Sequence, residues 1–105
     1  MPLVKHEDDR RTLIEWVKDF PLRSCKALVI KKDCEVGNHH HNKKDELFYL
    51  LMGEGTVTLD SKTETITPND TVYVGKGTRH AFNLKAGSIL LEASSRAFDP
   101  LDEIK

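Results

Sequence analysis

The most constraining feature of this chain is a run of three histidines, His39, His40 and His41, followed five residues later by Glu46. Side chains on a β-strand alternate between its two faces, so His39 and His41 point to the same side of a strand while His40 points away. A lone histidine, His80, follows about forty residues later and could come from a distant strand. Three imidazoles and one carboxylate suit a divalent transition metal that keeps open positions for water or substrate.

The chain from Cys25 onward contains short runs of apolar and β-branched residues separated by turn signals. Turns are predicted at 60–62 and 68–70, and two glycines, Gly75 and Gly77, interrupt the chain before His80. Strands this short and regularly spaced predict a β-sandwich or barrel and not a parallel α/β sheet. The predicted strands lie within 25–32, 46–52, 55–60, 63–67, 71–75 and 88–95.

The secondary structure near the N-terminus allows two interpretations. Residues 8–20 have apolar positions at near-helical spacing, but the side chains of 12–17 would alternate between two faces if this segment were a strand. At the other end, Asp99 followed by Pro100 is typical of an N-cap and a first helical position, which predicts a short terminal helix.

Composition limits the possible functions. The 105 residues are enough for one domain, and 16 basic against 17 acidic residues give a formal charge of −1. No basic stripe is visible, so we expect neither nucleic acid nor a membrane surface as a partner. The chain has no apolar signal region and no apolar run near the ~20 residues of a membrane span, so we expect a cytoplasmic protein. In that reducing compartment Cys25 and Cys34 would be free thiols.

The histidine segment resembles the first motif of the cupins, a glycine, His-x-His, a glutamate and a later glycine. The stretch 37–53, GNHHHNKKDELFYLLMG, places His39, His41, Glu46 and Gly53 on the family's positions. The stretch 69–83, NDTVYVGKGTRHAFN, is similar to the second motif, with Gly77 and His80 in place. It departs at three positions, since Asn69 replaces a glycine, Gly75 replaces a proline, and Asn83 comes one residue early.

The resemblance implies an all-β cupin fold, a double-stranded β-helix or jelly-roll barrel with four ligands facing its interior. It implies a barrel at 25–97, an N-terminal extension at 1–24 that packs on it, and a C-terminal tail at 98–105. If Glu46 faces inward, alternation predicts that Phe48, Leu50 and Met52 do too, and that His80 and Phe82 share a face. We expect Arg79 to face away from the site, and Lys43, Lys44 and Asp45 to be solvated.

The ends of the chain are similar to one branch of the superfamily, the dTDP-sugar 3,4-ketoisomerases. The similarity covers DDRRTLIEW near the start, GNHHHNK at the histidines and LEASSRAFDPLDEIK at the end. In that family the histidine matching His39 is implicated as the catalytic base and no metal is required. Arg11 stands here where those enzymes have glycine, and Glu46 restores a ligand that they tend to lack. The resemblance therefore implies a carbohydrate-like substrate but not the same reaction.

We interpret the chain as a metal-binding cupin with His39, His41, Glu46 and His80 as ligands. The ion could be Zn, Mn, Fe, Ni, Co or Cu, and it would act as a Lewis acid in isomerase or epimerase chemistry on a small polar molecule. His39, Tyr49 and Tyr73 are the candidate catalytic residues.

Two alternatives keep the same ligands: an Fe(II)-dependent dioxygenase, and a non-catalytic metal-dependent binding or sensor protein. We also expect a homodimer, in which apolar residues such as Leu13, Ile14 and Trp16 cover a sheet edge or a partner.

Overall fold

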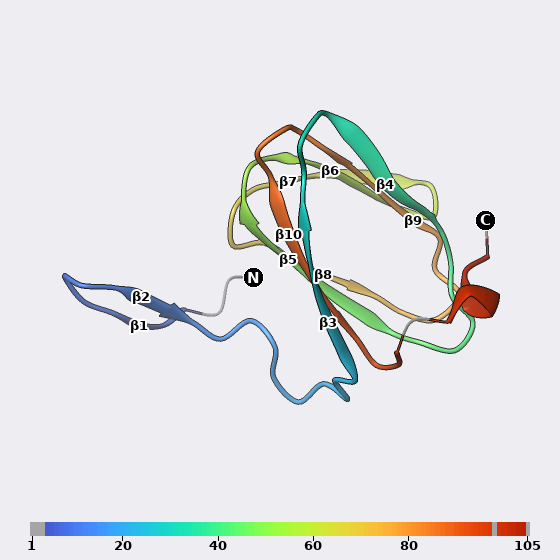
Figure 1. Cartoon of the computed structure of the whole chain (residues 1–105), viewed down its shortest axis with the longest axis horizontal. Coiled ribbons are helices and arrows are strands. Elements are labelled where there is room, and N and C mark those ends of the chain that lie inside the picture. Colours follow the sequence, from blue (N-terminus) through green and yellow to red (C-terminus); the bar gives the residue numbers. More distant parts are fainter. Residues whose placement is uncertain (1–3, 98, 105) are drawn as a thin grey trace.

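The computed structural model describes residues 4–97 and 99–104, which form ten β-strands and one 3-10 helix (Figure 1). Eight strands make two four-stranded antiparallel sheets, ordered β3-β10-β5-β8 and β4-β9-β6-β7, and the remaining two form a separate hairpin. The elements are β1 (Val4–Glu7), β2 (Thr12–Ile14), β3 (Ser24–Val29), β4 (Cys34–His39), β5 (Glu46–Met52), β6 (Gly55–Leu59), β7 (Lys62–Ile66), β8 (Thr71–Val74), β9 (His80–Leu84), β10 (Ile89–Ser94) and η1 (Pro100–Asp102).

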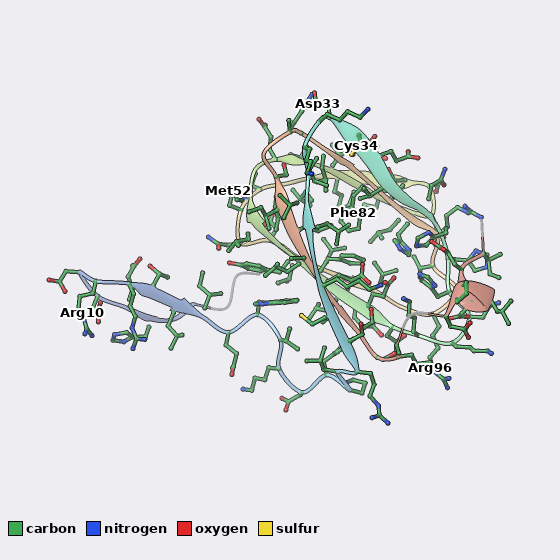
Figure 2. All side chains as sticks on the ribbon, viewed as in Figure 1. Arg10, Asp33, Cys34, Met52, Phe82 and Arg96 are labelled. Atoms are coloured by element: carbon green, nitrogen blue, oxygen red, sulfur yellow. The ribbon has the colours of Figure 1, made fainter. Side chains whose placement is uncertain are left out.

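The two sheets face each other and enclose one apolar core, which confirms the predicted jelly-roll barrel (Figure 1). Both predicted turns are present, and Asp60 and Asn69 adopt the left-handed backbone conformation in them. Figure 2 shows Phe82 inside the barrel. Among the described residues, no helix has the length and apolar character needed to cross a bilayer. The buried core residues are Ile30, Phe48, Leu50, Val57, Ile66, Val74, Phe82, Leu84 and Leu90.

Along β5, inward- and outward-facing side chains alternate over the first five residues, and the pattern then breaks. Phe48 and Leu50 are buried as predicted, but Met52 is 54% exposed and lies at the edge of the barrel (Figure 2). Leu90 pairs with Leu50 and the next residue, Ile89, pairs with Met52, so one residue of β5 has no partner. This β-bulge shifts the strand out of its period-two pattern. The prediction that Met52 faces inward is therefore wrong.

Gly53 ends the first motif at the turn between β5 and β6. It has a φ of +100°, and a Cβ atom there would lie 2.1 Å from the hydroxyl oxygen of Ser88. The fold therefore requires glycine at this position.

The N-terminal residues form a hairpin of β1 and β2 that projects from the barrel (Figure 1). The helix considered for residues 8–20 is wrong, and the strand is shorter than 12–17. The Asp8 carboxylate accepts the backbone N–H groups of Arg10 and Arg11, and this turn reverses the chain where a helix would have to begin. Beyond the hairpin, Trp16 stacks on Tyr49 with ring centroids 5.6 Å apart.

The predicted C-terminal helical turn is present as η1. The Asp99 carboxylate accepts the N–H of Leu101 at 3.0 Å, and Pro100 is the first residue of the turn. Both residues therefore act as the sequence predicted.

Candidate metal centre

A β-bulge in β4 places His39 in the barrel interior. Val36 pairs with Phe82 and Gly37 with Ala81, so regular pairing would set Asn38 opposite His80. Instead Asn38 adopts a φ of 69° and His39 pairs with His80. The extra residue moves His39 into the position that regular alternation would give to Asn38. His39 and His80 are thus neighbours on adjacent strands, at the end of the barrel where β5 begins.

The structure brings the three predicted histidine ligands together and places Glu46 beside two of them, His41 and His80. The ligand atoms of His39, His41 and His80 lie within 4.8 Å of one another. Glu46 Oε1 lies 3.4 Å from His41 Nε2 and 3.3 Å from His80 Nε2. Two ligands that each sit about 2.1 Å from one ion are separated by about 3.0–3.4 Å, so the distances from Glu46 Oε1 to the two imidazoles fit a shared cation.

Two of these ligand atoms are buried without a hydrogen-bond partner among the described residues. They are Nε2 of His41 and Oε1 of Glu46. Leaving a buried polar atom unsatisfied costs about 1–3 kcal/mol, and proteins rarely accept that cost without a functional reason. A cation at this point would satisfy both atoms, so the donor set fits a metal.

Each of the three imidazoles has an oxygen acceptor beside its Nδ1 atom. For His41 the acceptor is the backbone carbonyl of Asp102 at 3.0 Å, and for His80 it is the carbonyl of Thr78 at 3.3 Å. For His39 the neighbouring oxygen is Oε1 of Glu103, which lies 3.0 Å from Nδ1 as an ion-pair contact. For His41 and His80, a hydrogen on Nδ1 leaves the lone pair on Nε2, the tautomer that these hydrogen bonds select. Such outer contacts are the usual way a protein orients metal-binding histidines.

Burial keeps the three histidines neutral at neutral pH. It lowers the pKa of His80 to about 4, and it is also the main cause of the lowered pKa values of His39 and His41. Burial raises the pKa of Glu46, and the neighbouring Glu92 carboxylate raises it further, while Lys44 opposes both effects. A bound cation would favour the ionised form of Glu46.

Lys44 and Glu92 also belong to this site, and the sequence did not identify either. Lys44 is only 5% exposed, and its Nζ lies 3.5 Å from Glu46 Oε2. The prediction that it is solvated is wrong, because it lies two residues before Glu46 and shares its inward face, whereas Lys43 is exposed as expected. Glu92 lies on β10 between two inward-facing residues, Leu90 and Ser94. An acidic residue at an inward position of an apolar strand was the signal that could have identified it.

The contacts of Glu92 hold its carboxylate beside the histidines. Ser94 Oγ donates to Glu92 Oε2 at 3.1 Å, and Lys26 Nζ lies 3.8 Å from the same oxygen. A cavity of about 360 Å³ opens next to this carboxylate, and a smaller one of about 100 Å³ continues toward the apolar core. The larger cavity is lined by Lys26, Ala27, Leu28, His39, His41, Lys44, Glu46, Glu92 and Glu103.

The two candidate tyrosines lie away from the histidines. Tyr49 is buried on the opposite face of β5, where Trp16 stacks on its ring and its hydroxyl donates to Asn69 Oδ1. Tyr73, on β8, is 58% exposed. Arg79 donates from Nη1 to the carbonyl of Asn38, outside the ligand cluster as expected.

Comparisons with known proteins identify the family and the fold. The sequence profile of the Cupin domain matches residues 28–90. A curated, uncharacterised protein of Methanocaldococcus jannaschii is 29% identical over 62 residues, which are 59% of this chain and 49% of that protein. The chain therefore spans about half the length of that relative.

Several solved structures share the fold. A 3,4-ketoisomerase from Helicobacter canadensis superposes with a TM-score of 0.80 at 21% identity, covering 92% of this chain and 81% of that one. A sugar 3,4-ketoisomerase from Thermoanaerobacterium thermosaccharolyticum, in complex with TDP, gives 0.77 at 24%, covering 98% and 84%. A 3′-monoepimerase from Streptomyces bikiniensis, in complex with dTDP-quinovose, gives 0.83 at 20%, covering 97% and 65%. These likenesses show the fold, and the profile match over 28–90 shows that the chain belongs to the cupin family.

Proposed function

We propose that the chain binds one divalent transition metal through His39, His41, His80 and Glu46, and that it isomerises or epimerises a small carbohydrate-like molecule. The observation that carries the proposal is the buried pair of unpartnered atoms, His41 Nε2 and Glu46 Oε1. Both lie at spacings that suit a shared ion, and the imidazoles are neutral with their Nε2 lone pairs free to bind it.

The pocket supports the choice of substrate. When bound, the metal would supply Lewis-acid polarisation of a substrate carbonyl or hydroxyl oxygen. The cavity of about 360 Å³ suits a small polar molecule, and its charged groups, Lys26 and Lys44 among them, can bind hydroxyl or anionic substituents. The solved neighbours whose names specify sugar 3,4-ketoisomerase or 3′-monoepimerase support a carbohydrate derivative.

Isomerisation also needs a group that accepts a proton from one carbon and returns it to the next. We assign this role to the Glu92 carboxylate, which lines the same cavity as His39 and Glu46. Ser94 and Lys26 fix its position through contacts to Oε2. Leu28 and Phe48, which line the inner cavity, would exclude water from the reacting carbons.

The test is the metal content of tag-free protein, measured by elemental mass spectrometry beside two variants. We expect close to one equivalent in the wild type and in His6→Ala, because His6 is exposed and lies on the projecting hairpin. We expect none in His80→Ala. A wild type without metal even after reconstitution would contradict the proposal, and selective retention of iron would favour the dioxygenase instead.

A second candidate is metal-free keto-sugar isomerisation with His39 as the base. The 3.0 Å contact between His39 Nδ1 and Glu103 Oε1 favours it, because a carboxylate at Nδ1 makes Nε2 a better proton acceptor. Turnover of a nucleotide-linked keto-sugar in excess EDTA, lost in His39→Asn, would support this reaction. Turnover that stops with EDTA would exclude it.

We also propose that the chain is a homodimer. A two-stranded hairpin alone in water is marginally stable, so the projecting β1-β2 hairpin needs a partner surface. Exposed apolar residues supply candidates, including Leu13 at 46%, Val29 at 62% and Leu51 at 47%. Light scattering should give twice the chain mass, and a monomeric mass would contradict the proposal.

A further inference from the structure

The C-terminal segment Asp99–Ile104 lies against the loop that carries the histidines. His40 and Ile104 form a two-way backbone bridge, with N–H to carbonyl distances of 2.9 and 3.0 Å. Asp102 is 4% exposed, and its Oδ1 accepts the backbone N–H groups of Asn42 at 3.0 Å and Lys43 at 3.1 Å. The segment therefore holds the backbone of the loop on both sides of His41.

The same segment orients two of the three imidazoles. The carbonyl of Asp102 is the acceptor for His41 Nδ1, and the carboxylate of Glu103 is the partner of His39 Nδ1. Only His80 takes its Nδ1 acceptor from the barrel itself, from Thr78. The ligand set is thus assembled from the barrel and from a segment about sixty residues further along the chain.

We propose that residues 99–104 form a strap that completes the metal site, with Asp102 and Glu103 as positioning residues that set the metal affinity. This inference rests on the proposed metal binding. The Glu103 carboxylate contacts His39 Nδ1, while Asp102 holds the His41 ring through its main-chain carbonyl and the loop through its carboxylate. Removing such an outer contact typically weakens metal binding by about 10- to 100-fold.

The strap also couples metal binding to the docking of the tail. If the docked tail tightens metal binding, bound metal must stabilise the docked tail by the same factor, because equilibrium coupling between two sites is reciprocal. The backbone amides of His40 and Ile104, which close the bridge, report docking directly. Their hydrogen exchange should become slower when metal is bound.

The experiment measures the zinc dissociation constant of the full chain by competition with a chromophoric chelator. Glu103→Ala removes the carboxylate beside His39 Nδ1 and should weaken binding by about tenfold or more. Asp102→Ala keeps the main-chain carbonyl that faces His41 Nδ1 but removes the carboxylate that holds the loop, so it should weaken binding by a smaller factor, and Asp102→Asn, which keeps a side-chain acceptor oxygen, should recover part of that loss. The matched control is Glu64→Ala, an exposed acidic residue on β7 that pairs with Lys62 and should bind zinc as the wild type does. Cobalt absorption spectra of the same variants should show an altered ligand geometry.

Measurements in EDTA separate a positioning role from a merely structural one, because a structural role lowers the melting temperature without changing zinc affinity in the folded protein. Unchanged zinc affinity in both alanine variants would overturn the strap while leaving the proposed function intact. Equal exchange of the His40 and Ile104 amides with and without zinc, measured in the wild type, would also overturn it. A wild type that binds no zinc would overturn the strap and the proposed metal binding together.

Discussion

The two ends of the barrel interior are built from the same strands but differ in chemistry. On each of three strands, the inward-facing residues change from polar at one end to apolar further along. On β5 they are Glu46, then Phe48 and Leu50; on β9, His80, then Phe82 and Leu84; on β10, Ser94 and Glu92, then Leu90. One end is therefore a packed apolar core, and the other is a cluster of ionisable side chains.

This difference indicates that the apolar end stabilises the fold and that the polar end is suited to binding. At the apolar end the buried groups contact one another closely, as Phe48 and Phe82 do with ring centroids 4.7 Å apart. At the polar end, buried atoms of His41 and Glu46 remain without hydrogen bonds. A fold can hold such atoms because the apolar end stabilises the strands that carry them. Mutations at the two ends should therefore separate cleanly into effects on folding and effects on binding.

The largest effect should come from the apolar end. Phe82 is 1% exposed, and Phe82→Ala should lower the free energy of unfolding by about 3–5 kcal/mol, because it leaves a cavity beside Phe48. Urea unfolding in EDTA measures this without a metal contribution. Leu101→Ala is the control, since Leu101 is 86% exposed and its loss should change stability by less than about 0.5 kcal/mol. A loss below about 1 kcal/mol for Phe82→Ala would contradict the division.

Bound metal should add stability through the polar end. Zinc at one hundred times its dissociation constant should raise the free energy of unfolding of the wild type by about 2.7 kcal/mol. His41→Ala removes a ligand, so the same zinc concentration should give it little or no stabilisation. Thermal unfolding with and without zinc measures both. Equal stabilisation of the two proteins would mean that zinc binds elsewhere on the chain.

In the metal-free protein, the polar end should also make the free energy of unfolding depend on pH in the acid range. The pKa of His80 is about 4 in the fold and about 6.5 in an unfolded chain, so between these values the unfolded state binds the additional proton. Stability should therefore fall as the pH drops from about 6.5 to 4. A difference of this size corresponds to about 3 kcal/mol.

The variant His80→Gln isolates this contribution, since His39 and His41, whose pKa values are also lowered, remain. In EDTA, the free energy of unfolding should fall less steeply with decreasing pH for the variant than for the wild type. The raised pKa of Glu46 acts in the opposite sense and is common to both proteins, so the difference between the two curves reports His80. Parallel curves would contradict the assignment.

The sequence predicted the barrel and the residues that gather at its polar end, because period-two alternation and the spacing of the motifs are local. It placed Phe48 and Leu50 correctly and failed at Met52, where a bulge breaks the alternation. His39 faces inward only because of a second bulge, at Asn38, that alternation alone does not foresee.

Local sequence patterns do not predict contacts between distant parts of the chain. Asp102 and Glu103 looked like part of a charged tail, yet they contact histidines about sixty residues earlier. Local composition alone assigns the charged residues Glu92 and Lys44 to solvent, and in the sequence only their alternation with inward-facing neighbours indicates otherwise. The packing of the two sheets and the tail places Lys44, Glu92 and Glu103 in the lining of the cavity, and it places Asp102 against the loop that follows His41.

The smallest effect should come from the outer face of β5. Tyr49 donates its hydroxyl to Asn69 and stacks on Trp16, on the side of the strand opposite Glu46. Tyr49→Phe keeps the ring and removes one hydrogen bond, so it should cost about 1 kcal/mol of stability. Zinc affinity and any turnover should stay at wild-type values, because Tyr49 lines neither cavity at the site and contacts neither the ligands nor the C-terminal strap. A tenfold loss of turnover at unchanged zinc affinity would show instead that Tyr49 reaches the substrate, and the division between the two ends would not describe how this protein works.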